Sequence, residues 1–393
     1  MKLTRTIRSD RGAVLALVAI SLAVLLGIGG LALDSARGYV TKARLARAAD
    51  AAVLAGARSL RLGEDVARER ATQIAILNGA RMGTAGTDLD ITFGVNAEGE
   101  STVRVDAHID MPTRLMSVLG IDSMDVRSSA VAAVPPVDLV LVLDQSGSLK
   151  SADAFDDLQD AAKLFIDYFD DGIDQVGLVS FNVRGTERSP LAHSFTSRLK
   201  NEIDQLTSFG HTNAGEGLRL AMGQITGPSV RQRATKVVVF FTDGRPTAFR
   251  GDIDTEDRIL TVSTTGTNIY GYYDDPDNIP TTHLPPADGC TGLPDCFGWN
   301  EPATRAQARQ LGLDRASEMR EAGIIVYSIA LGNPNLSHPL LQPDLDYLKM
   351  IANEGGIADG SQPRGRSYFA PSAFELRGVF QQVASDLMTR LAQ

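Results

Sequence analysis

The sequence predicts an α/β fold: a doubly wound, mostly parallel sheet, preceded by one N-terminal transmembrane helix and a small α+β module. Two runs, VDLVLVL from Val137 and KVVVFFT from Lys236, have the composition of strands buried on both faces of a parallel sheet. From Val137 onward, segments with strand patterns alternate with segments with helix patterns, as a doubly wound sheet requires. The stretch from Ala13 to Leu33 contains 21 residues without a charge.

Composition limits the classes of function. A chain of 393 residues is long enough for two or three domains. The net charge of −10 argues against general binding to nucleic acid. The five histidines are scattered, with no HExxH and no Cys/His cluster, so the sequence predicts no zinc site.

The first 33 residues predict a membrane anchor. Residues 1–12 carry four basic side chains and one acidic side chain. The uncharged residues 13–33 would form a helix about 30 Å long, which matches the hydrocarbon core of a bilayer. The basic flank predicts that residues 1–12 stay in the cytoplasm and that the rest of the chain crosses.

Cleavage of this segment is the alternative. Gly30 and Ala32 could serve a signal peptidase, but the apolar stretch is longer than the roughly 7–15 residues of a secretory signal. Leu17 stands where pilin-type processing usually needs glutamate. We therefore expect an uncleaved anchor.

Residues 34–134 predict an α+β module. Asp34 to Leu60 has high helix propensity and no proline, so it should continue the membrane helix, and a second helix is expected at 64–78. Three runs with strict alternation, at 89–95, 103–111 and 124–134, predict half-buried strands. Thr113 to Leu119 can cover the sheet as a short helix. Pro135-Pro136 then forms a short, stiff linker.

Residues 137–393 predict the doubly wound domain. The expected helices lie at 155–168, 197–206, 302–322, 344–353 and 372–391, and the further strands at 175–182, 191–195 (an edge strand), 324–331 and 367–370. The segment at about 246–301 is longer than a compact domain requires and is interpreted as an insertion that shapes partner choice. Within it, Cys290 and Cys296 can form a small disulfide loop outside the cytoplasm, or remain a free thiol pair.

Oxygen-bearing side chains follow both central strands. The first strand ends at Asp144, with Ser146 and Ser148 directly after it, and the second ends at Asp243. Thr212 lies on a loop before a predicted helix. Ligands of open α/β sheets bind at the carboxyl ends of strands. Ligands that are all oxygen favour Mg²⁺, Mn²⁺ or Ca²⁺ over zinc.

These five positions resemble the metal-ion-dependent adhesion site of the von Willebrand factor type A family. The resemblance covers about Val137 to Arg390 apart from the insertion. It implies that the two serines and the threonine contact a divalent cation, that the two aspartates act largely through water, and that one coordination position is left for a carboxylate of a partner. Mg²⁺ is the first expectation, with Mn²⁺ or Ca²⁺ as alternatives.

The N-terminal third resembles the TadE/TadG-like segment of tight-adherence (Flp-type) pilus assembly proteins, which implies a pilin-like module. The residues that carry this resemblance are Arg11-Gly12, Leu33-Asp34, Tyr39, Leu45, Ala48-Ala49-Asp50-Ala51-Ala52 and Leu54-Ala55-Gly56-Ala57. TadG-like proteins join such a segment to an A-type domain.

The resemblances imply a bacterial inner-membrane protein that crosses once, with its C-terminal domain in the periplasm or at the cell surface. We expect a role in pilus assembly or adhesion, with other pilus components and a protein bearing an acidic side chain as partners. The alternative is an envelope accessory or scaffold that works with an AAA-type ATPase or chaperone system. The sequence has no G-x-S-x-G elbow and no P-loop, so no enzymatic activity is expected.

Overall fold

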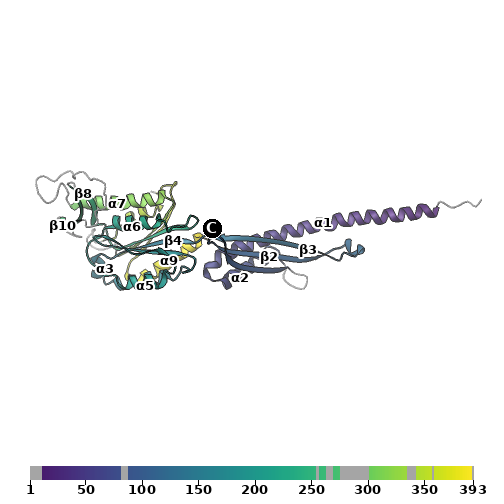
Figure 1. The fold of residues 1–393 in the computed structure, drawn as a ribbon, viewed down its shortest axis with the longest axis horizontal. Coiled ribbons are helices and arrows are strands. Elements are labelled where there is room, and N and C mark those ends of the chain that lie inside the picture. The colour runs from purple at the N-terminus through teal and green to yellow at the C-terminus, as the bar shows by residue number, and fades with distance from the viewer. Residues whose placement is uncertain are drawn as a thin grey trace, which may run out of the picture. The chain divides into compact units, whose positions relative to one another are not determined.

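The computed structural model describes residues 11–80, 87–253, 256–262, 269–274, 301–333, 342–355 and 358–391 (Figure 1). The chain forms two compact units. The N-terminal unit comprises residues 1–97 and 101–134, and the C-terminal unit comprises residues 98–100 and 135–391.

Two helices form one layer of the N-terminal unit. Helix α1 (Arg11–Ser59) runs for 49 residues without a break, which confirms the predicted continuation of the apolar helix. Its first half is exposed and apolar, and it is long and apolar enough to cross a membrane. After the short turn η1 (Leu60–Leu62), helix α2 (Glu64–Leu77) returns along α1. Small side chains allow this close approach: a Cβ added to Gly56 would lie 3.3 Å from the Cβ of Ala71.

A three-stranded antiparallel sheet forms the second layer. Its strands are β1 (Asp88–Val95), β2 (Ser101–Pro112) and β3 (Ser123–Val134), in that spatial order. Alternate residues such as Val103 and Val105 are buried with Ala48 and Ala52 of α1, because a strand presents every second side chain to one face. The short helix expected within 113–119 is confirmed as η2 (Met116–Leu119), and it lies against α1.

The C-terminal unit is built on a six-stranded sheet in the order β12-β11-β7-β4-β5-β6. All neighbouring pairs are parallel except β5 and β6. This confirms the predicted doubly wound, mostly parallel sheet, although the edge strand begins earlier than predicted. The strands are β4 (Val137–Asp144), β5 (Gln175–Phe181), β6 (Gly185–Ala192), β7 (Thr235–Thr242), β11 (Ile325–Leu331) and β12 (Ser367–Ala370).

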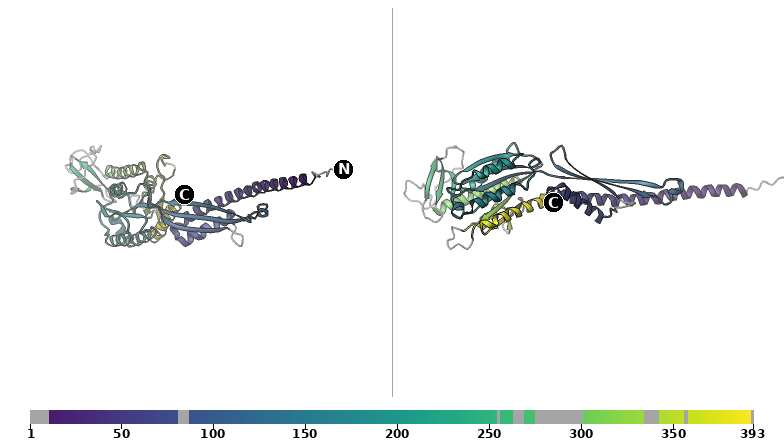
Figure 2. Two further views of the ribbon diagram at one scale, coloured as in Figure 1. Left: turned by 45° about the vertical axis from the view of Figure 1, so that its right-hand side comes forward. Right: turned by 90° about the horizontal axis from the view of Figure 1, so that it is seen from below.

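Helices cover both faces of this sheet (Figure 2). Leu139 and Leu141 of β4 face one hydrophobic core, whereas Val140 and Val142 face the other. The first core includes residues of α4 (Phe155–Ile166), α5 (Thr196–Asp204) and α9 (Ala373–Leu391), and the second includes residues of α6 (Ala214–Ile225), α7 (Glu301–Glu321) and α8 (Leu345–Ile351). Because both faces are covered, all eight residues of β4 are buried.

The insertion contains a sheet of its own. Strands β8 (Ala248–Ile253), β9 (Glu256–Val262) and β10 (Ile269–Asp274) pair as an antiparallel meander. The polar composition of the insertion gave no indication of these strands. Cys290 and Cys296 lie outside the described residues, so their disulfide stays a prediction.

A buried ion pair lies at the N-terminal end of β4, whereas Asp144 lies at the C-terminal end of the same strand. The side chain of Asp138 is fully buried, and its Oδ1 lies 2.9 Å from Nε of Arg231. The backbone N–H of Arg231 donates to Oδ2 of Asp138 at 2.8 Å. The same guanidinium donates to the carbonyl of Val137 at 2.9 Å. These bonds tie the segment before β7 to the first residues of β4.

Candidate metal-binding site

The candidate site lies at the carboxyl ends of the two central strands. Strands β4 and β7 are parallel neighbours, and Leu143 pairs with Phe241 near their ends. Asp144, the last residue of β4, and Asp243, which follows β7, therefore leave the sheet at the same edge. The short helix α3 (Gly147–Ser151) follows directly and brings Ser148 to this edge.

Asp144 is buried and fixed by hydrogen bonds. Its Oδ1 accepts the backbone N–H of Ser146 at 2.7 Å, and its Oδ2 accepts the hydroxyl of Thr242 at 2.5 Å. Burial raises the pKa of Asp144 above the ordinary value of 3.8, although these hydrogen bonds act in the opposite direction. This carboxylate shapes the loop and contributes negative charge behind the two serines.

Three side-chain oxygen atoms, those of Ser146, Ser148 and Asp243, form a compact row close to Asp144. The hydroxyl oxygens of Ser146 and Ser148 lie 3.1 Å apart. The Ser148 hydroxyl donates to Oδ1 of Asp243 at 2.9 Å. Adjacent ligands of octahedral Mg²⁺, with bonds of about 2.0–2.1 Å, are separated by about 2.9 Å. Hydrogen bonding alone accounts for the spacing of this row, which is also compatible with a small, hard divalent cation.

Thr212 reaches the same place from a separate loop. The backbone N–H of Gly147 donates to the carbonyl of Gly210 at 3.1 Å, which holds this loop against the first one. A Cβ added to Gly244 would lie 3.7 Å from Oγ1 of Thr212 and 4.0 Å from Oγ of Ser148. The hydroxyls of Thr212 and Ser148 therefore both lie within van der Waals range of the position next to Asp243.

Helix α6 begins directly after Thr212 and fixes its position. Asn213 is the N-cap: its side chain accepts the backbone N–H of Glu216, and its amide donates to the carbonyl of Val183 at 3.0 Å. The helix packs tightly on the sheet, because a Cβ added to Gly217 would lie 2.6 Å from Cδ1 of Phe181. Small residues and a capped end thus place Thr212 at the sheet edge.

The electrostatics of the site favour a cation. Desolvation, followed by repulsion from Asp144, raises the pKa of Asp243 above its ordinary value. Two carboxylates and three hydroxyl oxygens thus meet at one sheet edge, where Asp144, Ser146 and Thr212 are buried, Asp243 is half-buried and Ser148 is exposed. The structure brings together all five predicted residues, and their chemistry fits Mg²⁺, Mn²⁺ or Ca²⁺.

Three supporting residues were not identified from the sequence. The Thr242 hydroxyl donates to Asp144 and accepts the backbone N–H of Gly244, which lies next to the hydroxyls of Thr212 and Ser148. Arg188 of β6 donates to Ser180 at 2.8 Å and to the side chain of Gln145 at 3.2 Å, which steadies the loop from the edge strand. The T-D-G sequence that ends β7 was the available signal for the first two. Nothing in the sequence links Arg188 to Gln145.

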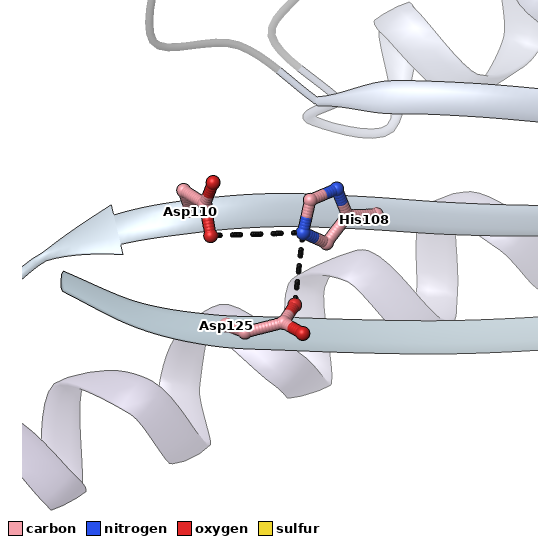
Figure 3. Close-up of side chains that lie close together, drawn as sticks. All are labelled: His108, Asp110 and Asp125. Carbon is pink, nitrogen blue, oxygen red and sulfur yellow. Dashed lines mark ion pairs between the residues drawn. The ribbon is translucent and has the colours of Figure 1, made fainter.

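A second polar cluster lies on the N-terminal unit, on the outer face of β2 and β3 (Figure 3). Asp110 and Asp125 are cross-strand partners. Nε2 of His108 lies 2.9 Å from Asp125 and 3.7 Å from Asp110, and Arg127 also pairs with Asp125, at 2.7 Å. The Arg127 guanidinium offsets part of the repulsion between the facing carboxylates, and the His108 ring adds a polar contact with both of them. The scattered histidine positions in the sequence did not indicate this cluster, although the alternation of β2 places His108 and Asp110 on one face.

Family comparisons match two parts of the chain. Residues 138–278 match the von Willebrand factor type A domain, and residues 12–59 match the Flp pilus-assembly TadE/G-like family. No curated protein matches the chain.

Solved structures show distant likeness. A mutant of the PilB minor pilin from Streptococcus sanguinis is 16% identical with a TM-score of 0.46, over 80% of this chain and 81% of that one. The von Willebrand factor domain of the type V pili tip protein Mfa5 from Porphyromonas gingivalis is 17% identical with a TM-score of 0.42. The match covers 66% of this chain and 97% of that one. Proximal thread matrix protein 1 from the mussel byssus is 17% identical with a TM-score of 0.39, over 65% of this chain and 46% of that one, so this chain spans about half of its length.

The N-terminal match lies on α1, and the second match begins at β4 and contains all five candidate ligands. The chain therefore joins a TadE/G-like N-terminal segment to a von Willebrand factor type A domain, which is the TadG-like architecture that its sequence predicted.

Proposed function

We propose that this chain is a membrane-anchored protein of a tight-adherence (Flp-type) pilus system that acts in assembly or adhesion by binding proteins, without catalysis. One observation carries the proposal: a pilus-assembly-like segment on an apolar helix is joined to an A-type domain whose five oxygen-bearing side chains converge at one sheet edge. The neighbouring pilus proteins share only the fold.

The A domain would bind its partners through a divalent cation, with Mg²⁺ foremost. Ser146, Ser148 and Thr212 would hold the cation, while Asp144 and Asp243 balance its charge. A bound cation would supply a Lewis-acidic position for a carboxylate on a partner protein. Phe209, which is 57% exposed, directly precedes Gly210, whose carbonyl accepts the bond that holds the two loops together. An exposed aromatic ring beside a charged centre supports a protein partner, because aromatic residues are enriched at protein interfaces.

We expect Ser148→Ala to weaken divalent-metal binding by at least about 10–100-fold, the range for removing a group that only orients a metal ligand, because Ser148 would itself be a ligand. Isothermal titration of the full chain in detergent with Mg²⁺, Mn²⁺ and Ca²⁺ measures this affinity. Ser151→Ala is the matched control, since Ser151 is also exposed on α3 but donates to the carbonyl of Gly147. Equal affinity in the two variants, or a folded wild-type chain that binds none of the metals, would contradict the proposed metal site.

We also expect residues 1–12 in the cytoplasm and the A domain outside it, in the periplasm or at the cell surface. Fusions of green fluorescent protein or alkaline phosphatase after Gln393 report the side of the membrane: only the phosphatase fusion should be active. The reverse pattern would favour the alternative function, in which the A domain works with a cytosolic AAA-type ATPase. As a control, the same fusions to a chain in which arginines replace Leu22 and Leu25, in the middle of the apolar stretch, should show the cytoplasmic pattern.

A further inference from the structure

The loop between β2 and β3 carries an exposed apolar tip. Residues 115–121, LMSVLGI, contain no charge, whereas Arg114 and Asp122 flank them. Four of their large apolar side chains are exposed, by 43% for Leu115, 84% for Val118, 62% for Leu119 and 44% for Ile121. Exposed apolar side chains that gather at one tip mark an interaction surface.

This tip lies beside the apolar part of α1. A Cβ added to Gly30 would lie 2.9 Å from the Cβ of Leu115, and one added to Gly27 would lie 3.8 Å from Cδ1 of Leu119. Both views in Figure 2 show the β2–β3 hairpin extending along α1 toward its N-terminal half. Gly27 and Gly30 lie inside the uncharged stretch that ends at Leu33. The tip is therefore continuous with the surface that α1 presents to a bilayer.

A carboxylate at the end of the apolar stretch fixes this arrangement. Asp34 is fully buried and accepts the backbone N–H groups of Arg114 at 3.0 Å, Leu115 at 2.9 Å and Met116 at 2.9 Å. Arg37 donates to the same carboxylate at 3.2 Å. Asp34 thus ties the loop to α1 at the level where charged residues first appear along the helix.

The backbone of the tip is suited to an environment without water. Besides the three N–H groups bound by Asp34, those of Val118, Gly120 and Ile121 donate to carbonyls within the loop at 3.0–3.2 Å. Gly120 has a φ of 82°, the left-handed conformation that favours glycine and ends η2. Irregular backbone is costly in a bilayer because its polar groups lack partners, and in this loop six backbone N–H groups have them.

We propose that residues 115–121 enter the outer leaflet of the same bilayer that α1 crosses, as a second membrane contact of the N-terminal unit. This rests on α1 spanning the membrane, but not on the metal site. Along a helix rising 1.5 Å per residue, Gly30 and Gly27 lie about 4.5 and 9 Å inside the end of the apolar stretch at Leu33. That depth matches the roughly 5–10 Å to which interfacial apolar segments are buried. Arg114 and Asp122, at the base of the tip, would stay among the headgroups.

Three exposed valines provide a matched test in the full chain. Val118 is at the tip, Val24 is in the apolar stretch of α1, and Val131 is on the outer face of β3, with exposures of 84%, 55% and 58%. Each is changed to cysteine in a chain with Cys290→Ser and Cys296→Ser, labelled with an environment-sensitive nitrobenzoxadiazole dye, and reconstituted into phosphatidylethanolamine/phosphatidylglycerol vesicles. The vesicles contain lipids with a nitroxide quencher either near the headgroup or near the end of the acyl chain.

The label at position 118 should show blue-shifted emission and lose most of its fluorescence to the shallow quencher. The label at position 24 should respond more to the deep quencher, and the label at position 131 to neither. A label at 118 that behaves like the one at 131, while 24 is quenched, would overturn the membrane contact but leave the anchor and the proposed function intact. A blue shift at 118 without quenching would also overturn it, in favour of a protein that covers the tip. Absence of quenching at 24 would overturn the proposal together with the anchor.

Discussion

Replacing Asp138 by alanine should lower the free energy of unfolding of the C-terminal unit by about 3–5 kcal/mol, the range for removing one partner of a buried ion pair. Asp138 is fully buried, and the side chain of Arg231 is only 22% exposed. Without the carboxylate, the guanidinium keeps its bond to the Val137 carbonyl but loses the charge that balances it. The loss should be large because most of the Arg231 side chain is shielded from water, so solvent can replace only part of the lost interaction.

Thermal unfolding of the full chain measures this effect. For a unit of this size, 1 kcal/mol shifts Tm by about 2–4 °C, so the expected decrease is about 6–20 °C. Asp204→Ala is the control: Asp204 is 58% exposed and pairs with Lys163 at 2.8 Å on the surface. An exposed pair contributes about 0–1 kcal/mol, so this variant should melt close to the wild type. Equal decreases in Tm for the two variants would show that the buried ion pair of Asp138 contributes no more to stability than the exposed pair of Asp204.

Replacing Asp243 by asparagine should abolish divalent-metal binding and, without metal, stabilise the C-terminal unit by about 1–2 kcal/mol, the usual size of a single stabilising change. The two effects have one cause. Asparagine has the shape of aspartate and can still accept the Ser148 hydroxyl, but it carries no charge to repel Asp144. If Asp243 serves metal binding as proposed, it would thus destabilise the metal-free protein.

The pH dependence gives a second readout of the same variant. The pKa of Asp243 is raised in the folded chain, so the folded state binds the proton more tightly than the unfolded state. Its contribution to the stability of the metal-free protein is complete below the unfolded pKa, near 3.8, and is lost as the pH rises through the raised folded pKa. Asp243→Asn should flatten this part of the stability profile.

Melting curves with excess EDTA and with Mg²⁺, at several pH values, separate the two effects. Wild-type Tm should rise with Mg²⁺, because a ligand that binds only the folded state stabilises it, whereas the variant should not respond. Asp160→Ala, which removes an exposed carboxylate of α4, is the control and should keep the Mg²⁺ response. A variant less stable than the wild type in EDTA would indicate that Asp243 is a structural residue.

The predictable part of the fold was the part with strong periodicity. The alternation of β2 indicates a half-buried strand, and the run of β4 indicates a buried strand because it is short and rich in valine and is followed by polar loop residues. The edge strand β6 was misplaced by several residues: Gly185–Ala192 is partly exposed, and an edge strand needs no continuous apolar pattern. The strands of the insertion were missed for a related reason, since Gly, Asp and Thr dominate its composition.

The candidate site also has a part that could be predicted from the sequence and a part that could not. Its five oxygen-bearing residues could be proposed because each follows a strand or opens a helix, where local sequence fixes position. Their support could not, because the contacts join distant segments: Thr242 is 98 residues from Asp144, and Arg188 is 43 residues from Gln145. The contact between Asp34 and Arg114, 80 residues apart, was missed for the same reason.

The unbroken course of α1 has a mechanical consequence. Its 49 residues, about 74 Å at 1.5 Å per residue, contain no proline that would provide a hinge. The half that packs on the β1–β3 sheet and the half that is apolar and exposed are thus one stiff rod. Tilting the rod within a bilayer would rotate the sheet with it, and tension applied to the sheet would reach the lipid-embedded turns through the hydrogen bonds of a single helix.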